Sequence, residues 1–247
     1  MVHRVYRVAP PGRPGRMATK RTTTTSTTKT ARRAVSATKK ASTAAKRTSR
    51  RPARAGGDAI AELKQDHRQV EQLFKRFEKA GDGARRAKRD TVAAMILELS
   101  RHAGIEELVF YPAVRAEVGD ADSDVLEALE EHHLVKVVLH ELEDLDPADE
   151  RFDAKVTVLM ENVRHHVKEE EHDLFPTVRE YLGRTRLREL GDELRAARTR
   201  VPTRPHPGAP DAPPGNARMG GAVAVMDRAR TVGQRVVDRV LDDAPRS

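Results

Sequence analysis

Two segments of this 247-residue chain repeat the same arrangement of side chains that can bind a metal. In each copy a histidine precedes a glutamate by four residues and a proline by ten: His102, Glu106 and Pro112 in the first, His166, Glu170 and Pro176 in the second. About 35 residues upstream of each copy, an acidic residue directly precedes a histidine: Asp66-His67 and Glu131-His132. Two matched sets of imidazole and carboxylate groups predict a centre that binds two metal ions.

The four histidines fall on apolar stripes that have the three- and four-residue spacing of a helix, so each stripe is expected to face the core. The stripes are Ile60, Leu63, His67, Val70, Phe74 and Phe77; Val92, Met95, Leu99, His102, Glu106 and Val109; Val125, Leu129, His132, Lys136 and Leu139; and Val156, Leu159, Val163, His166, Glu170 and Leu174. A histidine and a glutamate four residues apart share one helix face, so a single helix supplies both to one centre.

Polar groups on such stripes need partners. An imidazole or carboxylate in an apolar interior loses hydration worth on the order of several kcal/mol, which a bound metal offsets. A single histidine on an apolar face is most often a hydrogen-bonded core residue, but the duplication favours the metal. Imidazole and carboxylate ligands without thiolate suit Fe, Mn or Zn and argue against soft copper or iron–sulfur sites.

These residues resemble the hemerythrin-like, or HHE cation-binding, family of four-helix bundles, and the resemblance covers residues 58–182. It implies two non-haem iron ions bridged by two carboxylates and an oxo or hydroxo group. Carried over by position, the implied metal ligands are His67, His102, Glu106, His132, His166 and Glu170. The di-iron bundles of the ferritin type use Glu-x-x-His instead, which does not occur at these positions.

The chain departs from the oxygen-carrying members of that family at Lys136, where they have a further histidine. One imidazole fewer leaves a more open coordination sphere, which favours reactivity or sensing over reversible oxygen storage. We expect Glu107 and Glu171 to hold the ligands by hydrogen bonds, with bridging or plain solvation as alternatives. The other histidines of this region lie off the stripes and are expected to be exposed: His133, His140, His165 and His172.

Charge is distributed unevenly. Residues 1–57 hold 16 of the 46 Lys and Arg residues and no acid, which leaves 30 basic against 38 acidic residues elsewhere. A segment so poor in apolar residues is expected to be disordered. Its paired basic residues predict sequence-independent, salt-sensitive binding to nucleic acid. The alternatives are a solvated tail without a partner and an organellar transit peptide; Met17 is expected to be the true start.

The expected fold is all-α, an up-and-down antiparallel four-helix bundle with short loops. The expected parts are a disordered basic tail (1–57), the metal-binding bundle (58–182), a short accessory helix (183–200), a Pro/Gly-rich linker (201–220) and an amphipathic C-terminal helix (221–247). Asp58 is expected to cap the first helix, and Asp122 or Ser123 the third. Pro147 is expected to separate the third and fourth helices. Pro112 and Pro176 are expected to bend or end their helices, near the core residues Phe110 and Phe175. An accessory helix is expected from Leu187, Leu190 and Leu194, and a weakly docking stripe from Val225, Ala229, Val232, Val236 and Val240.

Function follows from the metal centre and the tail. The first hypothesis is a protein that senses or handles oxygen, peroxide, nitric oxide or iron, with the diatomic or peroxide ligand at the metal and the tail on DNA. The alternatives are an enzyme that decomposes peroxide, and a nucleoid-associated DNA-binding protein whose bundle is a metal-stabilised scaffold. The sequence has no cysteine and so forms no disulfide. It has no apolar run of membrane-spanning length and no signal-peptide core, so a cytoplasmic protein is expected, with nucleoid association as the further expectation from the basic tail.

Overall fold

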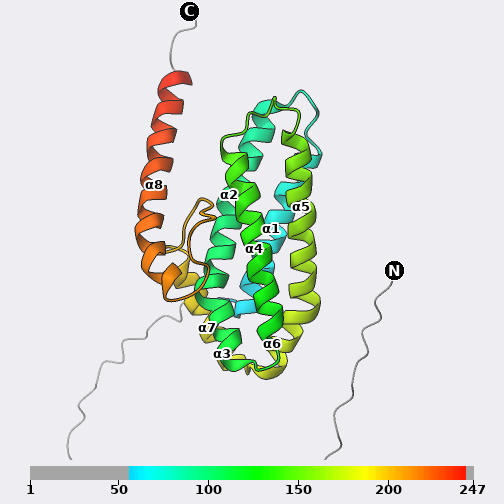
Figure 1. The fold of residues 1–247 in the computed structure, drawn as a ribbon, viewed down its shortest axis with the longest axis vertical. Coiled ribbons are helices and arrows are strands. Elements are labelled where there is room, and N and C mark those ends of the chain that lie inside the picture. Colours follow the sequence, from blue (N-terminus) through cyan, green and yellow to red (C-terminus); the bar gives the residue numbers. More distant parts are fainter. Residues whose placement is uncertain (1–55, 243–247) are drawn as a thin grey trace, which may run out of the picture. The chain divides into compact units, whose positions relative to one another are not determined.

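The computed structural model describes residues 56–242, and all regular secondary structure in that range is helical, which confirms the all-α class (Figure 1). The helices are α1 (Ala59–Glu78), α2 (Arg85–Ile105), η1 (Glu106–Phe110), α3 (Tyr111–Glu117), α4 (Asp122–Glu143), α5 (Phe152–Glu169), η2 (Glu170–Leu174), α6 (Phe175–Tyr181), α7 (Arg184–Ala197) and α8 (Gly215–Asp242). Long helices α1, α2, α4 and α5 pack side by side, with consecutive ones antiparallel. Residues 1–55, with most of the basic tail and Met17, lie outside the described range.

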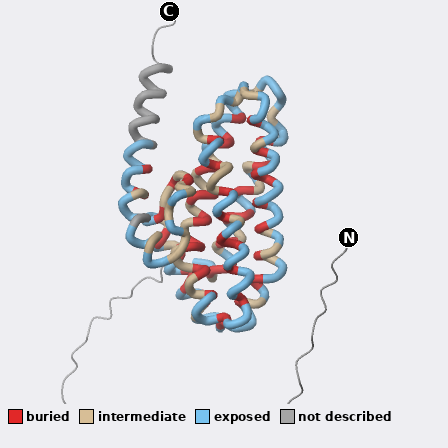
Figure 2. Tube along the Cα trace, in the orientation of Figure 1, coloured by how far each residue is buried: buried red, intermediate tan, exposed pale blue. Residues whose placement is uncertain are grey.

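Buried residues recur along the helices of the bundle (Figure 2). The apolar ones form two clusters, one on each side of the histidines. On α1, for example, Leu63 belongs to one cluster and Val70 to the other, with His67 between them. The same order recurs on α4, where Leu129, His132 and Val135 follow one another. Since apolar layers lie above and below, the histidines occupy a dry level of the bundle.

Both prolines of the repeat lie within uninterrupted helical segments, so of the two expected effects, a bend or an end of the helix, the end does not occur. Each is preceded by a π-helical turn, η1 or η2, that begins at the glutamate of the repeat. The N–H of Tyr111 bonds to the carbonyl of Glu106, and that of Phe175 to the carbonyl of Glu170. Proline has no N–H and its ring crowds the preceding turn, and a widened turn accommodates both effects. Such π turns often occur at functional sites.

The capping predictions have mixed outcomes. Asp58 caps α1, because its Oδ1 accepts the N–H of Ala61 at 2.8 Å. The start of α4 has no side-chain cap, so that prediction is wrong: Asp122 accepts a bond from Arg115 Nε at 2.6 Å instead. Pro147 lies in the connection between α4 and α5, as expected.

The accessory helix is confirmed as α7, which packs against α1 with its leucines buried: Leu187, Leu190 and Leu194. Close approach requires glycine here, since a Cβ at Gly191 would lie 2.8 Å from the carbonyl oxygen of Gly57. After α7 the chain returns to α2, where Val201 is buried against Gly104.

Helix α8 contacts the bundle by a different face from the predicted one. Val225 is 64% exposed, whereas Ala224 and Asp227 are buried, so the predicted stripe is wrong at Val225. A long-range bond selects this face, because the N–H of Thr203 donates to Asp227 Oδ2 at 3.0 Å. The side chains of Val232, Val236 and Val240 lie outside the described residues. No helix among residues 56–242 combines the length and apolar character that a membrane span needs.

Candidate metal centre

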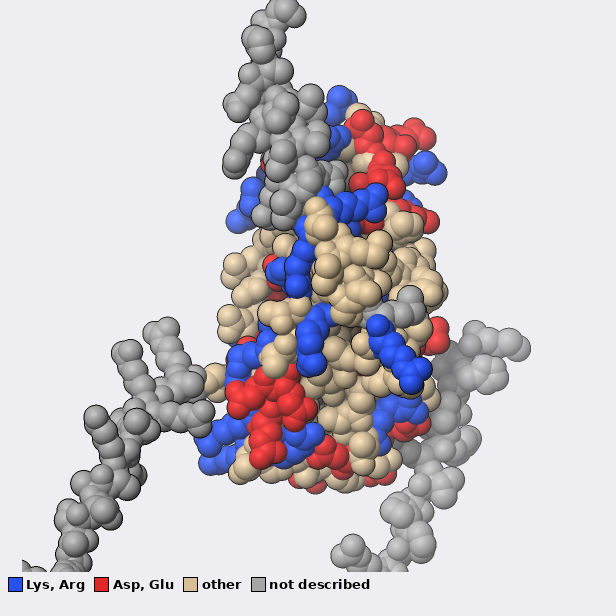
Figure 3. Space-filling model, turned by 90° about the vertical axis from the view of Figure 1, so that its left-hand side faces the viewer, with Lys and Arg blue, Asp and Glu red and all other residues tan. Residues whose placement is uncertain are grey.

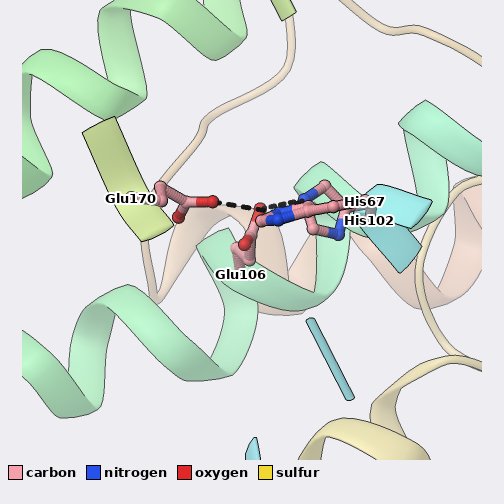
Figure 4. A group of neighbouring side chains, drawn as sticks. All are labelled: His67, His102, Glu106 and Glu170. Carbon is pink, nitrogen blue, oxygen red and sulfur yellow. Dashed lines mark hydrogen bonds and ion pairs between the residues drawn. The ribbon is translucent and has the colours of Figure 1, made fainter. Parts of the chain in front are cut away.

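The six side chains singled out in the repeat converge between the two apolar clusters. They come from α1, α2, η1, α4, α5 and η2, so every long helix of the bundle contributes. All are at most 5% exposed: His67, His102, Glu106, His132, His166 and Glu170. Figure 4 shows four of them, with both imidazoles and both carboxylates directed toward a common point.

The four histidines form two pairs. His67 Nε2 lies 3.1 Å from His102 Nε2, and His132 Nε2 lies 3.2 Å from His166 Nε2. Each pair joins the two long helices of one half of the repeat, α1 to α2 in the first and α4 to α5 in the second. Two neutral imidazoles that present Nε2 to the same point offer two lone pairs to one cation.

Each glutamate spans the two pairs. Glu106 Oε2 lies 3.2 Å from His102 Nε2 and 3.5 Å from His132 Nε2. Glu170 Oε2 lies 3.2 Å from His67 Nε2 and 3.6 Å from His166 Nε2. Glu106 therefore belongs to both groups of potential ligands that the described residues form here, and the geometry offers two cation positions with shared carboxylates.

The carboxylate oxygens fit a bound cation. Both oxygens of Glu106 and Oε2 of Glu170 are buried without a hydrogen-bond partner, because the nearby imidazole nitrogens are close but poorly aligned. Burying a charged carboxylate without a partner costs on the order of several kcal/mol. An ion pair or a bound metal offsets this cost. Four imidazoles and two carboxylates are a donor set that suits divalent first-row metals.

Four further carboxylates lie at the outer nitrogens of the histidines, and three of them are within hydrogen-bond distance. Glu171 Oε1 lies 2.8 Å from His67 Nδ1, and Glu107 Oε1 lies 3.0 Å from His132 Nδ1. The hydrogen bonds expected of Glu107 and Glu171 are thereby confirmed. Sequence reasoning assigned no role to the other two contacts, Glu131 Oε2 at 2.7 Å from His166 Nδ1 and Asp66 Oδ2 at 3.5 Å from His102 Nδ1. Their signal was the acid directly before each upstream histidine.

Basic side chains neutralise three of these four carboxylates. Lys64 Nζ lies 3.0 Å from Glu171 Oε2, and Arg198 Nη2 lies 2.6 Å from Asp66 Oδ2. Lys136 Nζ lies 2.7 Å from Glu107 Oε1. Lys136 thus binds the carboxylate that holds His132, and the place of a fifth imidazole is taken by an ion pair.

Burial controls the protonation of the site. It lowers the pKa of His102 to about 4, although the Asp66 carboxylate opposes the change. Burial also lowers the pKa of His132. It raises the pKa of Glu106 well above its ordinary value, and the charge of Glu170 raises it further. Burial acts the same way on Glu170, but His166 and His67 outweigh it and hold that pKa low.

These shifts leave the site poised for a cation. Two carboxylates in one dry site do not both ionise without a compensating positive charge, so Glu106 keeps a proton while Glu170 is charged. The neutral imidazoles of His102 and His132 keep their Nε2 lone pairs available as ligands. Burial lowers the pKa of His166, but the carboxylates of Glu170 and Glu131 outweigh it and raise that pKa above its ordinary value. A bound cation would displace the protons that remain on ligand atoms.

Aromatic side chains close the site beside the prolines. The hydroxyl of Tyr111 donates to Glu170 Oε1 at 3.0 Å and lies 3.4 Å from His132 Nε2. At the matching position of the second copy, Phe175 stacks on the ring of His67, with centroids 5.8 Å apart. Sequence reasoning missed Tyr111; its signal was the residue directly before the proline in each copy. Phe110 and Phe175 are buried, and the four histidines off the stripes are exposed, as expected: His133, His140, His165 and His172.

Comparison with known proteins agrees with this geometry. The model of the hemerythrin HHE cation-binding domain matches residues 58–178. An uncharacterised hemerythrin-like protein of Schizosaccharomyces pombe is 27% identical over 175 residues, which cover 69% of this chain and 83% of that protein. A protein of Nostoc sp. named DNA nickase is 28% identical over 142 residues, which cover 58% of this chain but only 39% of that protein.

A solved structure shares the fold. The crystal structure of a hemerythrin HHE cation-binding domain-containing protein from Mycobacterium kansasii superposes with a TM-score of 0.51 at 24% identity, covering 58% of this chain and 86% of that one. The family match, the likeness to the hemerythrin-like protein of Schizosaccharomyces pombe and the convergent histidines and glutamates identify residues 58–178 as a hemerythrin HHE cation-binding domain, and this chain as a hemerythrin-like protein.

Proposed function

We propose that the bundle holds two non-haem metal ions, preferentially iron, and that the protein senses or handles oxygen, peroxide, nitric oxide or iron at this centre. The proposed ligands are His67, His102, Glu106, His132, His166 and Glu170. The observation that carries the proposal is the set of buried, unpartnered oxygens of Glu106 and Glu170 between two histidine pairs.

The chain prepares the ligands in advance. His67, His132 and His166 each have a carboxylate within hydrogen-bond distance of Nδ1, which keeps the proton on that nitrogen and leaves Nε2 free to bind a metal. Asp66 lies 3.5 Å from Nδ1 of His102. Iron held there supplies one-electron chemistry and a binding position for a small ligand. The ion pair of Lys136 and Glu107, in place of a fifth imidazole, favours an open position and hence reactivity over oxygen storage.

An enzyme that decomposes peroxide at the same centre is the second candidate, and Tyr111 favours it. Its hydroxyl is buried, donates to Glu170 and lies next to His132, so it holds a proton at the edge of the site. Burial and the carboxylate of Glu106 keep the pKa of Tyr111 well above its usual value, so this proton stays in place until chemistry at the centre draws on it. Repeated peroxide turnover without loss of iron would distinguish this enzyme from a sensor.

We further propose that residues 1–57 bind nucleic acid without sequence preference, with the protein in the cytoplasm at the nucleoid. The support is their 16 basic residues without an acid and the likeness to a protein named DNA nickase. On the face that Figure 3 shows, Lys and Arg side chains alternate with Asp and Glu around uncharged residues, so this face of the folded part does not offer a continuous basic surface. The third candidate is a nucleoid-associated protein in which the same tail binds DNA and the bundle is only a metal-stabilised scaffold.

Metal content per chain after production with iron tests the proposal. Wild type is compared with His102→Ala plus His166→Ala, and with His133→Ala plus His140→Ala as the matched control of exposed histidines. We expect about two irons in wild type and control, and their loss from the first variant. Little metal in wild type, or equal metal in all three proteins, would show that the buried histidines are structural.

A further inference from the structure

A cleft with a volume of about 240 Å³ opens beside the centre, between α4 and the end of α5 with η2. Its lining includes six carboxylates and no Lys or Arg: Asp124, Glu127, Glu131, Glu169, Glu170 and Asp173. A concave surface of one sign of charge concentrates ions of the opposite sign. The cleft therefore attracts cations.

The inner end of the cleft reaches the candidate ligands. Glu170 and His166 belong to its lining as well as to the metal centre. Glu170 is 2% exposed, and its Oε2 has no hydrogen-bond partner. The cleft thus connects solvent to a buried carboxylate oxygen that is ready to accept a cation.

A second group of potential ligands lies at this side of the centre, beside the cleft. His165 Nε2 is 3.2 Å from Glu169 Oε1 and 3.8 Å from Glu131 Oε1. One imidazole and two carboxylates suit a divalent first-row cation, and the partial exposure of all three side chains suits weak, reversible binding. Glu131 also contacts His166 Nδ1 through its other oxygen, so one carboxylate touches both this outer group and a ligand of the centre.

The matching side of the other half of the repeat is covered by α7. There Asp66 and Glu62 stand at the positions that Glu131 and Glu127 occupy on α4. Arg195 on α7 lies 2.6 Å from Glu62, and Arg198, directly after α7, lies 2.6 Å from Asp66, so two basic side chains neutralise these acids. Of the two matched sides, only the one on α4 keeps its negative charge open to solvent.

We propose that this cleft is the route by which a divalent transition-metal cation reaches the centre, with Glu131, His165 and Glu169 as an outer binding station. The proposal rests on the proposed function, because it supplies the metal to that site. The rim carboxylates Glu127 and Asp173 attract the ion, the outer station holds it, and Glu170 receives it at the inner end.

The test is the rate of Co²⁺ uptake by the metal-free full-length protein, followed by visible absorption in stopped flow. Glu127→Gln plus Asp173→Asn removes two exposed rim charges, and Glu161→Gln plus Glu180→Gln is the matched control on exposed sites outside the cleft. We expect the rim variant to load roughly tenfold more slowly, with a weaker dependence on ionic strength and the same final cobalt content. The control should load at the wild-type rate.

His165→Gln tests the outer station. Uptake should slow while the final content stays the same, because His165 is exposed and is not one of the six buried ligands. Wild-type rates in both the rim variant and His165→Gln would overturn the route while leaving the centre intact. Absence of cobalt binding to wild type would overturn the centre and the route together.

Discussion

Tyr111 and Phe175 occupy matching positions before the prolines of the two copies, yet they make different contacts with the candidate metal centre. Tyr111 donates a hydrogen bond to Glu170, at 3.0 Å, whereas Phe175 has no polar atom and stacks on His67. The duplicated site is therefore asymmetric: one half carries a hydroxyl proton next to a ligand carboxylate, and the other half does not.

Tyr111→Phe should make the two halves alike. Phe175 shows that a phenyl ring fits this position of the repeat, so we expect a folded variant that loses the free energy of one buried hydrogen bond, about 1–2 kcal/mol. Urea unfolding of the metal-free protein measures this loss. Tyr181→Phe, which removes a solvent-exposed hydrogen bond to Asp120, is the control and should cost less than the buried bond. If peroxide is decomposed at the centre, the variant should also turn it over more slowly. An unchanged free energy of unfolding would mean that the bond to Glu170 contributes nothing.

Glu106→Gln should raise the stability of the metal-free protein and weaken its metal binding. Because burial and Glu170 raise the pKa of Glu106, its carboxyl stays protonated in the folded metal-free protein well above its ordinary value of 4.5. The stability that it contributes is therefore present at low pH and is lost as the pH rises through the raised pKa. Glutamine never ionises, so the metal-free variant should be more stable than wild type at pH 8, by roughly 1–3 kcal/mol, with a smaller difference at pH 5.

The same variant should bind metal poorly, since Glu106 spans both histidine pairs. Urea unfolding at pH 5 and pH 8, with metal content as the second measurement, checks both statements. Glu161→Gln, on the exposed face of α5, is the control. A variant that is less stable than wild type at pH 8 would contradict the assignment of Glu106 as a strained, uncompensated carboxyl.

The lowered pKa of His102 should make the stability of the protein depend on pH in the opposite direction. Its pKa is lowered from 6.5 to about 4 in the folded protein, so between these values the unfolded chain binds a proton that the folded chain does not. Stability should therefore fall as the pH drops from 6.5 toward 4, by up to roughly 3 kcal/mol from this residue. The ring carbon and nitrogen resonances of His102 in the metal-free protein should show a neutral imidazole at pH 5. A charged ring at pH 5 would refute the shift.

Much of the bundle could be predicted from the sequence, because helical periodicity is local information. The spacing of apolar residues placed His67, His102, His132 and His166 on inward faces, and the repeat placed Glu106 and Glu170 beside them. Side-chain contacts between elements decided the rest. Asp122 or Ser123 was expected to cap α4, but Asp122 accepts a bond from Arg115 at the end of α3 instead. Val225 is exposed, and the neighbouring Asp227 accepts the N–H of Thr203.

The finer construction of the site was also beyond local patterns. Proline at position 112 or 176 predicts a disturbed helix, but whether the backbone ends, bends or widens depends on packing against the other helices. Likewise, the sequence shows only that Lys136 stands where the oxygen-carrying members of the family have a histidine. Its pairing with Glu107 is visible only once α2 and α4 lie side by side.

The carboxylates at the outer histidine nitrogens should tune metal affinity. Glu107→Gln removes the anion at His132, and Glu171→Gln removes the anion at His67. Each variant should lose about 10- to 100-fold in affinity, since a neutral amide orients the imidazole less firmly and makes it a weaker base. Competition with a chelator measures this loss, with Glu161→Gln as the control. Wild-type affinity in both variants would mean that these contacts are incidental.

The proposed DNA binding should reside in the basic tail. Residues 1–57 carry all of the excess positive charge, whereas the remainder has 38 acidic residues against 30 basic ones. Binding of a random duplex to the full chain should weaken steeply with salt, at about 0.9 log units of affinity per log unit of salt for each phosphate contacted. Deletion of residues 1–57 should abolish this binding while the metal content, which reports a folded bundle, stays unchanged. Equal DNA affinity in the shortened chain would move the interface to the bundle or α8 and would end the tail hypothesis.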